Sequence, residues 1–196
     1  MRLFIAATLP LDVAEALDHV IRSVKPRVGA ASWVRPEAQH VTFAFVGEQP
    51  ERAIDTISAA LAPRLAPVAA LDARLEGAGF FPSRSRPRIA WCSVTPRDPL
   101  MAIATVVRER LAVAGIPFDE KPFHPHLTLA RLKGSWAAES VAAFESAIGA
   151  FDSPLFHIDH VLLYGSRLST EGATHTLLAS YPLARSSRPP YTDEPS

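Results

Sequence analysis

Cysteine is almost absent from this 196-residue chain, which has only Cys92. One thiol cannot build a disulfide framework or a cysteine-rich zinc site, so a small domain stabilised by disulfides or by cysteine-bound zinc is excluded. Cys92 lies between Trp91 and Ser93 in an apolar segment, and we expect it in the core. No apolar run approaches the roughly 20 residues that a membrane-crossing helix needs, so we expect no membrane association.

An excess of charge of either sign is also absent. Twenty Lys and Arg residues balance twenty Asp and Glu residues, which leaves a formal net charge of zero. Neutrality disfavours a protein that coats nucleic acid without regard to sequence, although it permits a local phosphate site. The first apolar run ends at Pro10 and is too short for a signal peptide, so we expect a cytoplasmic protein. We also expect a monomer that uses no cofactor.

Apolar residues are present in sufficient number for a core. They make up 48% of the chain, which is ordinary for a globular protein and too high for a disordered one. The length suits one domain, or two small lobes that share a core. We therefore predict one bilobal domain over residues 1–184, followed by a flexible, polar and proline-rich tail over residues 185–196.

Strands and helices are predicted in the same order in each half of the chain. Residues 2–76 have the pattern strand, helix, strand, helix, strand, with elements expected at 2–8, 11–24, 40–46, 51–61 and 68–75. Residues 88–164 repeat this order at 89–94, 99–114, 126–132, 137–150 and 155–164, and a last strand is expected at 174–181. Loops are expected at 25–38, 81–88 and 116–125. The repeat predicts two duplicated αβ lobes, which would place the two middle strands in equivalent positions, on either side of a cleft if a two-fold axis relates the lobes.

The middle strand of each half begins with the pattern His-x-Thr. His40 and Thr42 start the first of these strands, and His126 and Thr128 start the second. Residues i and i+2 of a strand project from the same face, so each strand presents an imidazole beside a hydroxyl. If a pseudo-two-fold axis relates the lobes, two histidines and two threonines face one point in the cleft.

This set of side chains suits phosphodiester chemistry. Histidine titrates near neutrality, with an ordinary pKa of about 6.5, so one imidazole can serve as a base while another serves as an acid. Threonine hydroxyls can donate hydrogen bonds to the phosphate oxygens. In-line displacement at phosphorus needs a base on one side, an acid on the other and donors between them. Such a site requires no metal.

The sequence resembles the RNA 2′,3′-cyclic phosphodiesterases, also called 2′-5′ RNA ligases, of the 2H phosphoesterase superfamily. The resemblance extends over the whole chain up to the tail. It rests on three segments. The first is Met1-Arg2-Leu3-Phe4-Ile5-Ala6, and the second is His40-Val41-Thr42-Phe43 followed by Phe45-Val46-Gly47-Glu48. The third is Pro125-His126-Leu127-Thr128-Leu129-Ala130-Arg131. It implies a bilobal α+β fold of duplicated αβ lobes, with antiparallel sheets around a central cleft. It also implies RNA or oligonucleotide ends as substrates. It also implies hydrolysis of a terminal 2′,3′-cyclic phosphate to a 2′-phosphomonoester, with reversible, ATP-independent 2′-5′ joining.

The resemblance also implies a role for each site residue. His40 would protonate the departing ribose 3′ oxygen and His126 would activate water, although the near-symmetric sequence alone does not distinguish the acid from the base. Thr42 and Thr128 would hold the phosphate oxygens, and Arg131 would add positive charge. Strict alternation puts Arg131 on the opposite face from His126, so a bulge or the end of the strand must turn it inward.

One part of the chain departs from the family pattern. The family has Ser-x-Leu followed by Gly-x-x-Tyr, whereas this chain has Ser166-Arg167-Leu168 followed by Gly172-Ala173-Thr174-His175. The histidine in place of tyrosine leaves the substrate contacts of the last hairpin open. Taken as isolated residues on predicted strands, His157, His160 and His175 are each expected to be partnered or exposed.

Two other groups of side chains have competing interpretations. His124, His126 and His40 could supply three zinc ligands, but Pro125 separates the first two and no carboxylate lies at ligand spacing, so we predict no metal. Arginines at 84, 86 and 88 belong either to a solvated loop or to a contact with the RNA backbone.

The aromatic residues also have two interpretations. Trp33 and Trp136 could stack on a base or pack in the interior. Alternation along residues 40–46 places Phe43 and Phe45 on the core side.

Two other functions remain open from the sequence. The same chemistry could act on a small molecule, such as a cyclic nucleotide or an ADP-ribose cyclic phosphate. A nucleotide- or RNA-end-binding module without turnover is the alternative from a different class.

Overall fold

The computed structural model describes residues 1–169 and 172–185, and it has the predicted order of elements. The first half contains β1 (Arg2–Thr8), α1 (Leu11–Val24), β2 (Ala31–Trp33), β3 (His40–Glu48), α2 (Ala53–Leu65) and β4 (Leu71–Ser83). The second half contains β5 (Arg86–Thr95), α3 (Arg97–Val113), β6 (His126–Leu132), α4 (Ala138–Gly149), β7 (Phe156–Ile158), β8 (His160–Ser169) and β9 (Gly172–Pro182). The predicted tail lies outside the described residues, except for Arg185, which is exposed.

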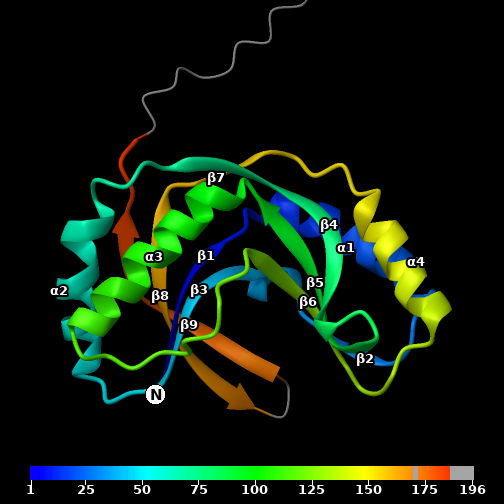
Figure 1. Ribbon diagram of the computed structural model, residues 1–196, viewed down its shortest axis with the longest axis horizontal. Coiled ribbons are helices and arrows are strands. Elements are labelled where there is room, and N and C mark those ends of the chain that lie inside the picture. The colour runs from blue at the N-terminus through cyan, green and yellow to red at the C-terminus, as the bar shows by residue number, and fades with distance from the viewer. Residues whose placement is uncertain (170–171, 186–196) are drawn as a thin grey trace, which may run out of the picture.

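The strands of the described residues join in one curled sheet with the order β7-β4-β5-β6-β3-β1-β8-β9, and β2 also pairs with β6 (Figure 1). The centre of this order is the antiparallel contact of β3 with β6, where Val41 pairs with Leu127. Moving outward, β1 corresponds to β5 and β8 corresponds to β4. Strand β4 of the first half therefore pairs with β5 of the second half, and β8 of the second half pairs with β1 of the first. The two lobes of the predicted α+β fold share one continuous sheet.

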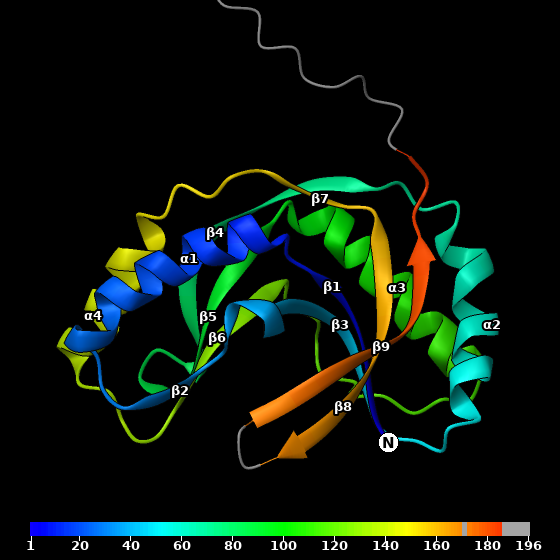
Figure 2. The same cartoon turned by 180° about the vertical axis from the view of Figure 1, so that it is seen from behind.

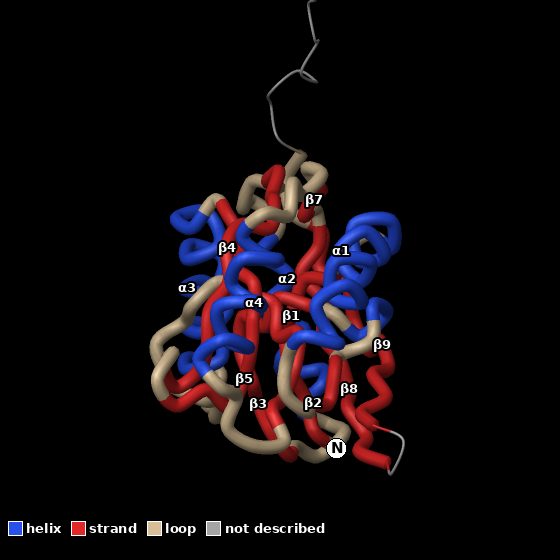
Figure 3. The backbone as a smooth tube through the Cα atoms, turned by 90° about the vertical axis from the view of Figure 1, so that its right-hand side faces the viewer, coloured by secondary structure: helices blue, strands red, loops and turns tan. Residues whose placement is uncertain are grey.

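The helices are exchanged between the lobes in the same way. Helix α2 contacts α3 and β9, and α3 contacts β3, so both cover the lobe built on β1, β3, β8 and β9. Helix α4 contacts α1 and β4, which places this pair over the other lobe, as Figure 2 shows from behind. Each lobe carries one helix from each half of the chain, and Figure 1 shows α2 and α3 on the left and α1 and α4 on the right. Figure 3 views the molecule from the side that carries α1 and α4.

Helical spacing explains why these segments bury one face. In α1 the buried apolar residues recur every three or four positions, and in α3 they follow the same rule. Helix α2 runs four residues beyond its predicted end, to Leu65, which is fully buried. No helix among the described residues is long and apolar enough to cross a membrane.

The structure of three predicted segments differs from the prediction. The loop expected at 25–38 contains β2, which pairs with β6, together with two short 3-10 turns at Lys25–Arg27 and Pro36–Ala38. The loop expected at 81–88 is the end of a β4–β5 hairpin, in which Pro82 pairs with Pro87. Proline suggested a loop there, but the two prolines oppose each other at the end of the ladder, where few hydrogen bonds are lost. The strand expected at 155–164 divides at Asp159 into β7 and β8.

An aromatic cluster fills the interior of the lobe that α1 and α4 cover. Phe144 of α4 is fully buried, and its ring centroid lies 5.4 Å from that of Phe80, 5.8 Å from Trp136 and 6.4 Å from Trp33. Trp136 therefore packs in the core, as one of its two interpretations held. Cys92 is also fully buried, as expected, and burial raises the pKa of its thiol to about 12.

Candidate active site

A bulge in β6 turns Arg131 toward the cavity side of the sheet. Trp91 of β5 pairs with Thr128, but the next pair is Ala90 with Ala130, so Leu129 has no partner on β5. One extra residue in a strand reverses the alternation beyond it. Leu129 and Ala130 are consequently both buried, and Arg131 emerges on the same face as Thr128. This is the bulge that an inward Arg131 requires.

The same irregularity occurs in β3. Thr42 pairs with Ala6 and Ala44 pairs with Ile5, which leaves Phe43 unpaired. Phe43 and Ala44 are both buried, whereas Phe45 is 39% exposed and lines the cavity. The prediction that Phe45 faces the core was wrong, because it assumed unbroken alternation.

The central strand pair brings the two His-x-Thr segments side by side. Because Val41 pairs with Leu127 in an antiparallel contact, His40 lies opposite Thr128 and Thr42 lies opposite His126. The apolar residues between them anchor the strands, since Val41 and Leu127 are at most 1% exposed. All four polar side chains project from the same face.

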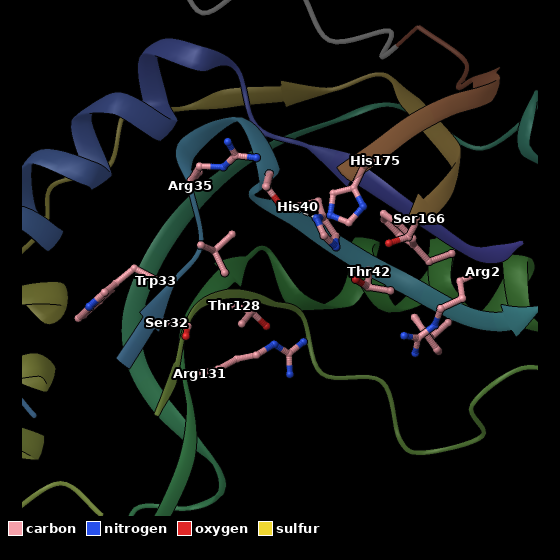
Figure 4. A pocket seen from close by; sticks show the side chains of 14 residues that line it. Arg2, Ser32, Trp33, Arg35, His40, Thr42, Thr128, Arg131, Ser166 and His175 are labelled. Atoms are coloured by element: carbon pink, nitrogen blue, oxygen red, sulfur yellow. Dashed lines mark hydrogen bonds between the residues drawn. The ribbon is translucent and has the colours of Figure 1, made fainter. Parts of the chain in front are cut away.

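A cavity of about 450 Å³ opens on this face, within the usual size range of small-molecule sites. Four of the five predicted site residues line it, and Figure 4 shows their side chains directed into one space from two strands. The lining residues are Arg2, Phe4, Ser32, Trp33, Val34, Arg35, Ala38, His40, Thr42, Phe45, Thr128, Arg131, Ser166 and His175.

His126, the fifth predicted site residue, is not part of this lining. Its ring packs edge-on against Phe81, with the centroids 4.9 Å apart, and lies 6.1 Å from the ring of Trp91. Trp91 in turn packs so closely on Gly79 that a Cβ there would collide with the indole. This aromatic wall packs against His126, which lies opposite Thr42 on the neighbouring strand.

Both histidines are held by the same kind of hydrogen bond. Nδ1 of His40 lies 2.7 Å from the carbonyl oxygen of Ala38, and Nδ1 of His126 lies 2.6 Å from that of His124. A carbonyl oxygen can only accept, so each Nδ1 carries the proton and donates it. Each Nε2 therefore keeps a free lone pair when the ring is neutral and can accept a proton from a ligand.

Burial lowers the pKa of both imidazoles and so disfavours their protonated forms. It lowers the pKa of His40 to about 4, against the opposing hydrogen bond to Ala38, and repulsion from His175 and His126 lowers it further. Burial also lowers the pKa of His126, again against its carbonyl hydrogen bond, and repulsion from His124 adds to the effect. An anion bound between them would favour the protonated forms.

The arrangement can therefore bind an anion and move protons around it. Two hydroxyls and a guanidinium supply donors, and two Nε2 atoms supply sites for a proton. Within residues 1–169 and 172–185, no three His, Cys, Asp or Glu side chains converge as the ligands of a metal would.

A comparison with protein families assigns the chain. The sequence profile of the 2′-5′ RNA ligase superfamily matches residues 10–168, which include both His-x-Thr strands. The chain belongs to the 2′-5′ RNA ligase superfamily. Membership confirms the resemblance found from the motifs.

Relatives in the superfamily match over nearly the whole chain. Two proteins named RNA 2′,3′-cyclic phosphodiesterase are similar, one from Thermotoga maritima (30% identity, covering 91% of this chain and 93% of the relative) and one from Thermus thermophilus (33%, covering 93% and 90%). The crystal structure of E. coli LigT complexed with 3′-AMP superposes with a TM-score of 0.73 at 25% identity, covering 93% of this chain and 97% of LigT. These likenesses confirm the 2H phosphoesterase fold.

His175 is a residue of the cavity that sequence reasoning misjudged. Its ring stands edge-on to that of His40, with the centroids 5.4 Å apart, and both rings pack on Phe4 (Figure 4). Its Nδ1 is buried and has no hydrogen-bond partner among the residues that the structure describes. The expectation of a partnered or exposed residue was wrong for His175, and its place in the family's tyrosine position was the available signal.

The expectation was right for the other two histidines of the C-terminal strands. His157 contacts Asp72 at 2.9 Å, and His160 contacts Asp159 at 2.7 Å. Trp33 lines the cavity, but it also packs on Trp136, so its two interpretations are not exclusive.

The arginines of the β4–β5 hairpin lie outside the cavity lining. Arg84 forms an ion pair with Glu145, with Nε 3.0 Å from Oε1, and Arg86 and Arg88 are exposed.

The lowered pKa of His40 can be tested by an NMR pH titration. We expect the His40 imidazole to titrate near pH 4 in the free protein, far below its ordinary pKa, because burial disfavours the charged ring. Saturating inorganic phosphate is expected to raise this pKa. A His40→Gln variant assigns the resonance, and titration near 6.5 in the free protein would contradict the expected burial.

Proposed function

We propose that the protein hydrolyses the 2′,3′-cyclic phosphate at the end of an RNA or oligonucleotide to a 2′-phosphomonoester. In this proposal catalysis is metal-independent and uses two histidines, and attack by a 5′-hydroxyl in place of water joins two ends through a 2′-5′ bond, reversibly and without ATP. The observation that carries it is the pair of His-x-Thr segments on neighbouring strands beside one cavity. The names of the relatives and the 3′-AMP bound by LigT support a substrate with a nucleotide end.

The base of the proposed reaction is His126. Its Nδ1 is committed to the carbonyl of His124, so Nε2 is free to take a proton from water. The water oxygen then bonds to phosphorus in line with the 3′ oxygen, as the displacement requires. The aromatic wall around His126 fixes the direction of the ring.

The acid of the proposed reaction is His40, which gives its Nε2 proton to the 3′ oxygen as the bond from phosphorus to that oxygen breaks. The 2′ oxygen stays on phosphorus, and the product is the 2′-phosphomonoester. Because burial keeps His40 neutral in the empty site, its proton must arrive with the anionic substrate, which stabilises the imidazolium. In the reverse direction the acid acts as the base, which makes the reaction reversible.

Negative charge that develops on the non-bridging oxygens is met by Thr42, Thr128 and Arg131. The hydroxyls donate without adding charge, and the guanidinium donates with charge. Since the bulge in β6 directs Arg131 into the cavity, all three can reach one phosphate group.

Product analysis tests the proposal directly. An RNA oligomer with a 2′,3′-cyclic phosphate is incubated with the protein and excess EDTA, and the end is identified by phosphorus NMR. We expect a 2′-phosphate to form at the same rate with and without the chelator. A 3′-phosphate would contradict the assigned leaving group, and loss of turnover with EDTA would contradict the metal-independent mechanism.

A cyclic mononucleotide and an ADP-ribose cyclic phosphate serve as comparison substrates in the same assay. Faster turnover of either than of the oligomer would favour the small-molecule alternative. No turnover of any of the three would favour a binding module.

A further inference from the structure

The cavity has a cation on only one of its two pseudo-symmetric strands. Residues 40–45 and 126–131 match position by position, with the bulge at the same place in each. Arg131 occupies the sixth position of the second segment, whereas Phe45 occupies the sixth position of the first. The pseudo-two-fold arrangement therefore puts an apolar ring where the other lobe has a guanidinium.

Arg2 supplies the missing charge from the neighbouring strand. Its guanidinium carbon lies 5.3 Å from the centroid of the Phe45 ring, within the range of a cation–π contact. Both residues line the cavity, and Figure 4 shows the side chains of Arg2 and Arg131 extending into it from opposite sides. Stacking on the ring covers one face of the guanidinium and leaves N–H groups at its edge.

No strong partner neutralises Arg2 among the described residues. Its Nε lies 3.9 Å from Oε1 of Glu48, at the limit of an ion pair. Glu48 is 70% exposed and has a closer contact, at 3.1 Å, with the amino group of Met1. A bound phosphate could therefore compete effectively for Arg2, which is itself 38% exposed.

The position of Arg2 along β1 separates it from the reacting phosphate. The ring of Phe4 packs against His40, with the centroids 4.7 Å apart. Arg2 lies two residues further along the strand, which corresponds to about 7 Å at the usual strand rise. A group held by Arg2 is therefore one step along the cavity from a group held at His40, a step on the scale of one nucleotide.

We infer that Arg2, held flat by Phe45, binds the phosphate one nucleotide away from the reacting one. This inference rests on the proposed function and deepens it, because it names the substrate class. The site takes an oligonucleotide with at least two phosphates, in which Arg131 holds the reacting phosphate and Arg2 holds its neighbour. A cyclic mononucleotide lacks the second phosphate and leaves Arg2 unused.

The test compares two substrates in three variants. The substrates are uridine 2′,3′-cyclic phosphate and a trinucleotide with the same end, and the variants are Arg2→Ala, Arg2→Lys and Arg64→Ala. Arg64 is exposed on α2, outside the cavity lining, and controls for the loss of one positive charge. The quantity measured is the ratio of kcat/KM for the trinucleotide to that for the mononucleotide.

Arg2→Ala is expected to lower this ratio about tenfold, because one charge-assisted contact to phosphate is lost. Its salt dependence on the trinucleotide should weaken by about 0.7 in the log–log slope, the value for one phosphate of a single strand. Arg2→Lys should keep most of the ratio, and Arg64→Ala should keep all of it. An unchanged ratio in Arg2→Ala, or a lysine variant as poor as the alanine variant, would overturn the inference.

Binding separates this inference from the proposed function. If the wild-type protein turned over neither substrate, the proposed function would fail, but calorimetry with a trinucleotide 2′-phosphate and with uridine 2′-phosphate would still test Arg2. Weaker binding of the trinucleotide alone by Arg2→Ala would support the second phosphate site. Equal effects on both ligands would overturn it.

Discussion

Replacing His40 or His126 with alanine is expected to lower kcat on a cyclic-phosphate end by at least about 100-fold in each case. Each change removes one of the two proton-transfer groups of the proposed reaction, whose ring is oriented by a hydrogen bond to a backbone carbonyl. The measurement is steady-state turnover of a cyclic-phosphate oligomer with EDTA present. The double variant should be little worse than the single ones, because the two groups act as a unit.

His160→Ala is the matched control for these variants. His160 is an imidazole on β8 that contacts Asp159 and does not line the cavity, so its loss should leave kcat within about twofold of the wild-type value. Unchanged turnover in both His40→Ala and His126→Ala would falsify the site. A large loss in only one of them would mean that catalysis needs a single imidazole.

Phe144→Ala is expected to lower the free energy of unfolding by about 3–5 kcal/mol. The ring is fully buried and packs on Phe80, Trp136 and Trp33, so its removal leaves a cavity that rigid aromatic neighbours cannot fill. Urea unfolding at neutral pH, followed by tryptophan fluorescence, measures the change. Because Trp33 also lines the cavity of the candidate site, ligand binding should weaken in the same variant.

Val113→Ala provides the contrast, because Val113 ends α3 and is 74% exposed. Its effect should stay within about 0.5 kcal/mol, as is usual for surface positions. If the two variants lost similar stability, the aromatic cluster would not be the centre of this lobe's core.

Local patterning was enough to predict most of the elements. Strand β1, helix α1 and strand β6 begin and end where periodicity and the flanking residues predict. Errors arose where a segment's structure depends on a partner strand. Segment 31–33 is too short to have a periodicity of its own, and it becomes a strand only because β6 offers its edge.

The candidate site was predictable to a similar extent. His40, Thr42 and Thr128 could be assigned to one cavity from the repeat and from alternation, since residues two apart share a face. Arg131 needed a bulge that the sequence alone does not locate. Arg2 and His175 were missed because strands β1 and β9, which carry them to the cavity, are far from either motif in the chain.

The amino-acid sequence by itself was sufficient to propose the chemistry of this protein, because it places imidazoles and hydroxyls two residues apart in β-forming segments, twice. It also determined which face of each helix is buried, because helical periodicity is a property of consecutive residues. The tertiary structure alone decided how the two halves interleave and where the bulges turn Phe45 and Arg131 toward the cavity. It also placed Arg2 and His175 in the cavity lining. These features depend on strand register and on contacts between distant segments, which neither propensity nor periodicity encodes.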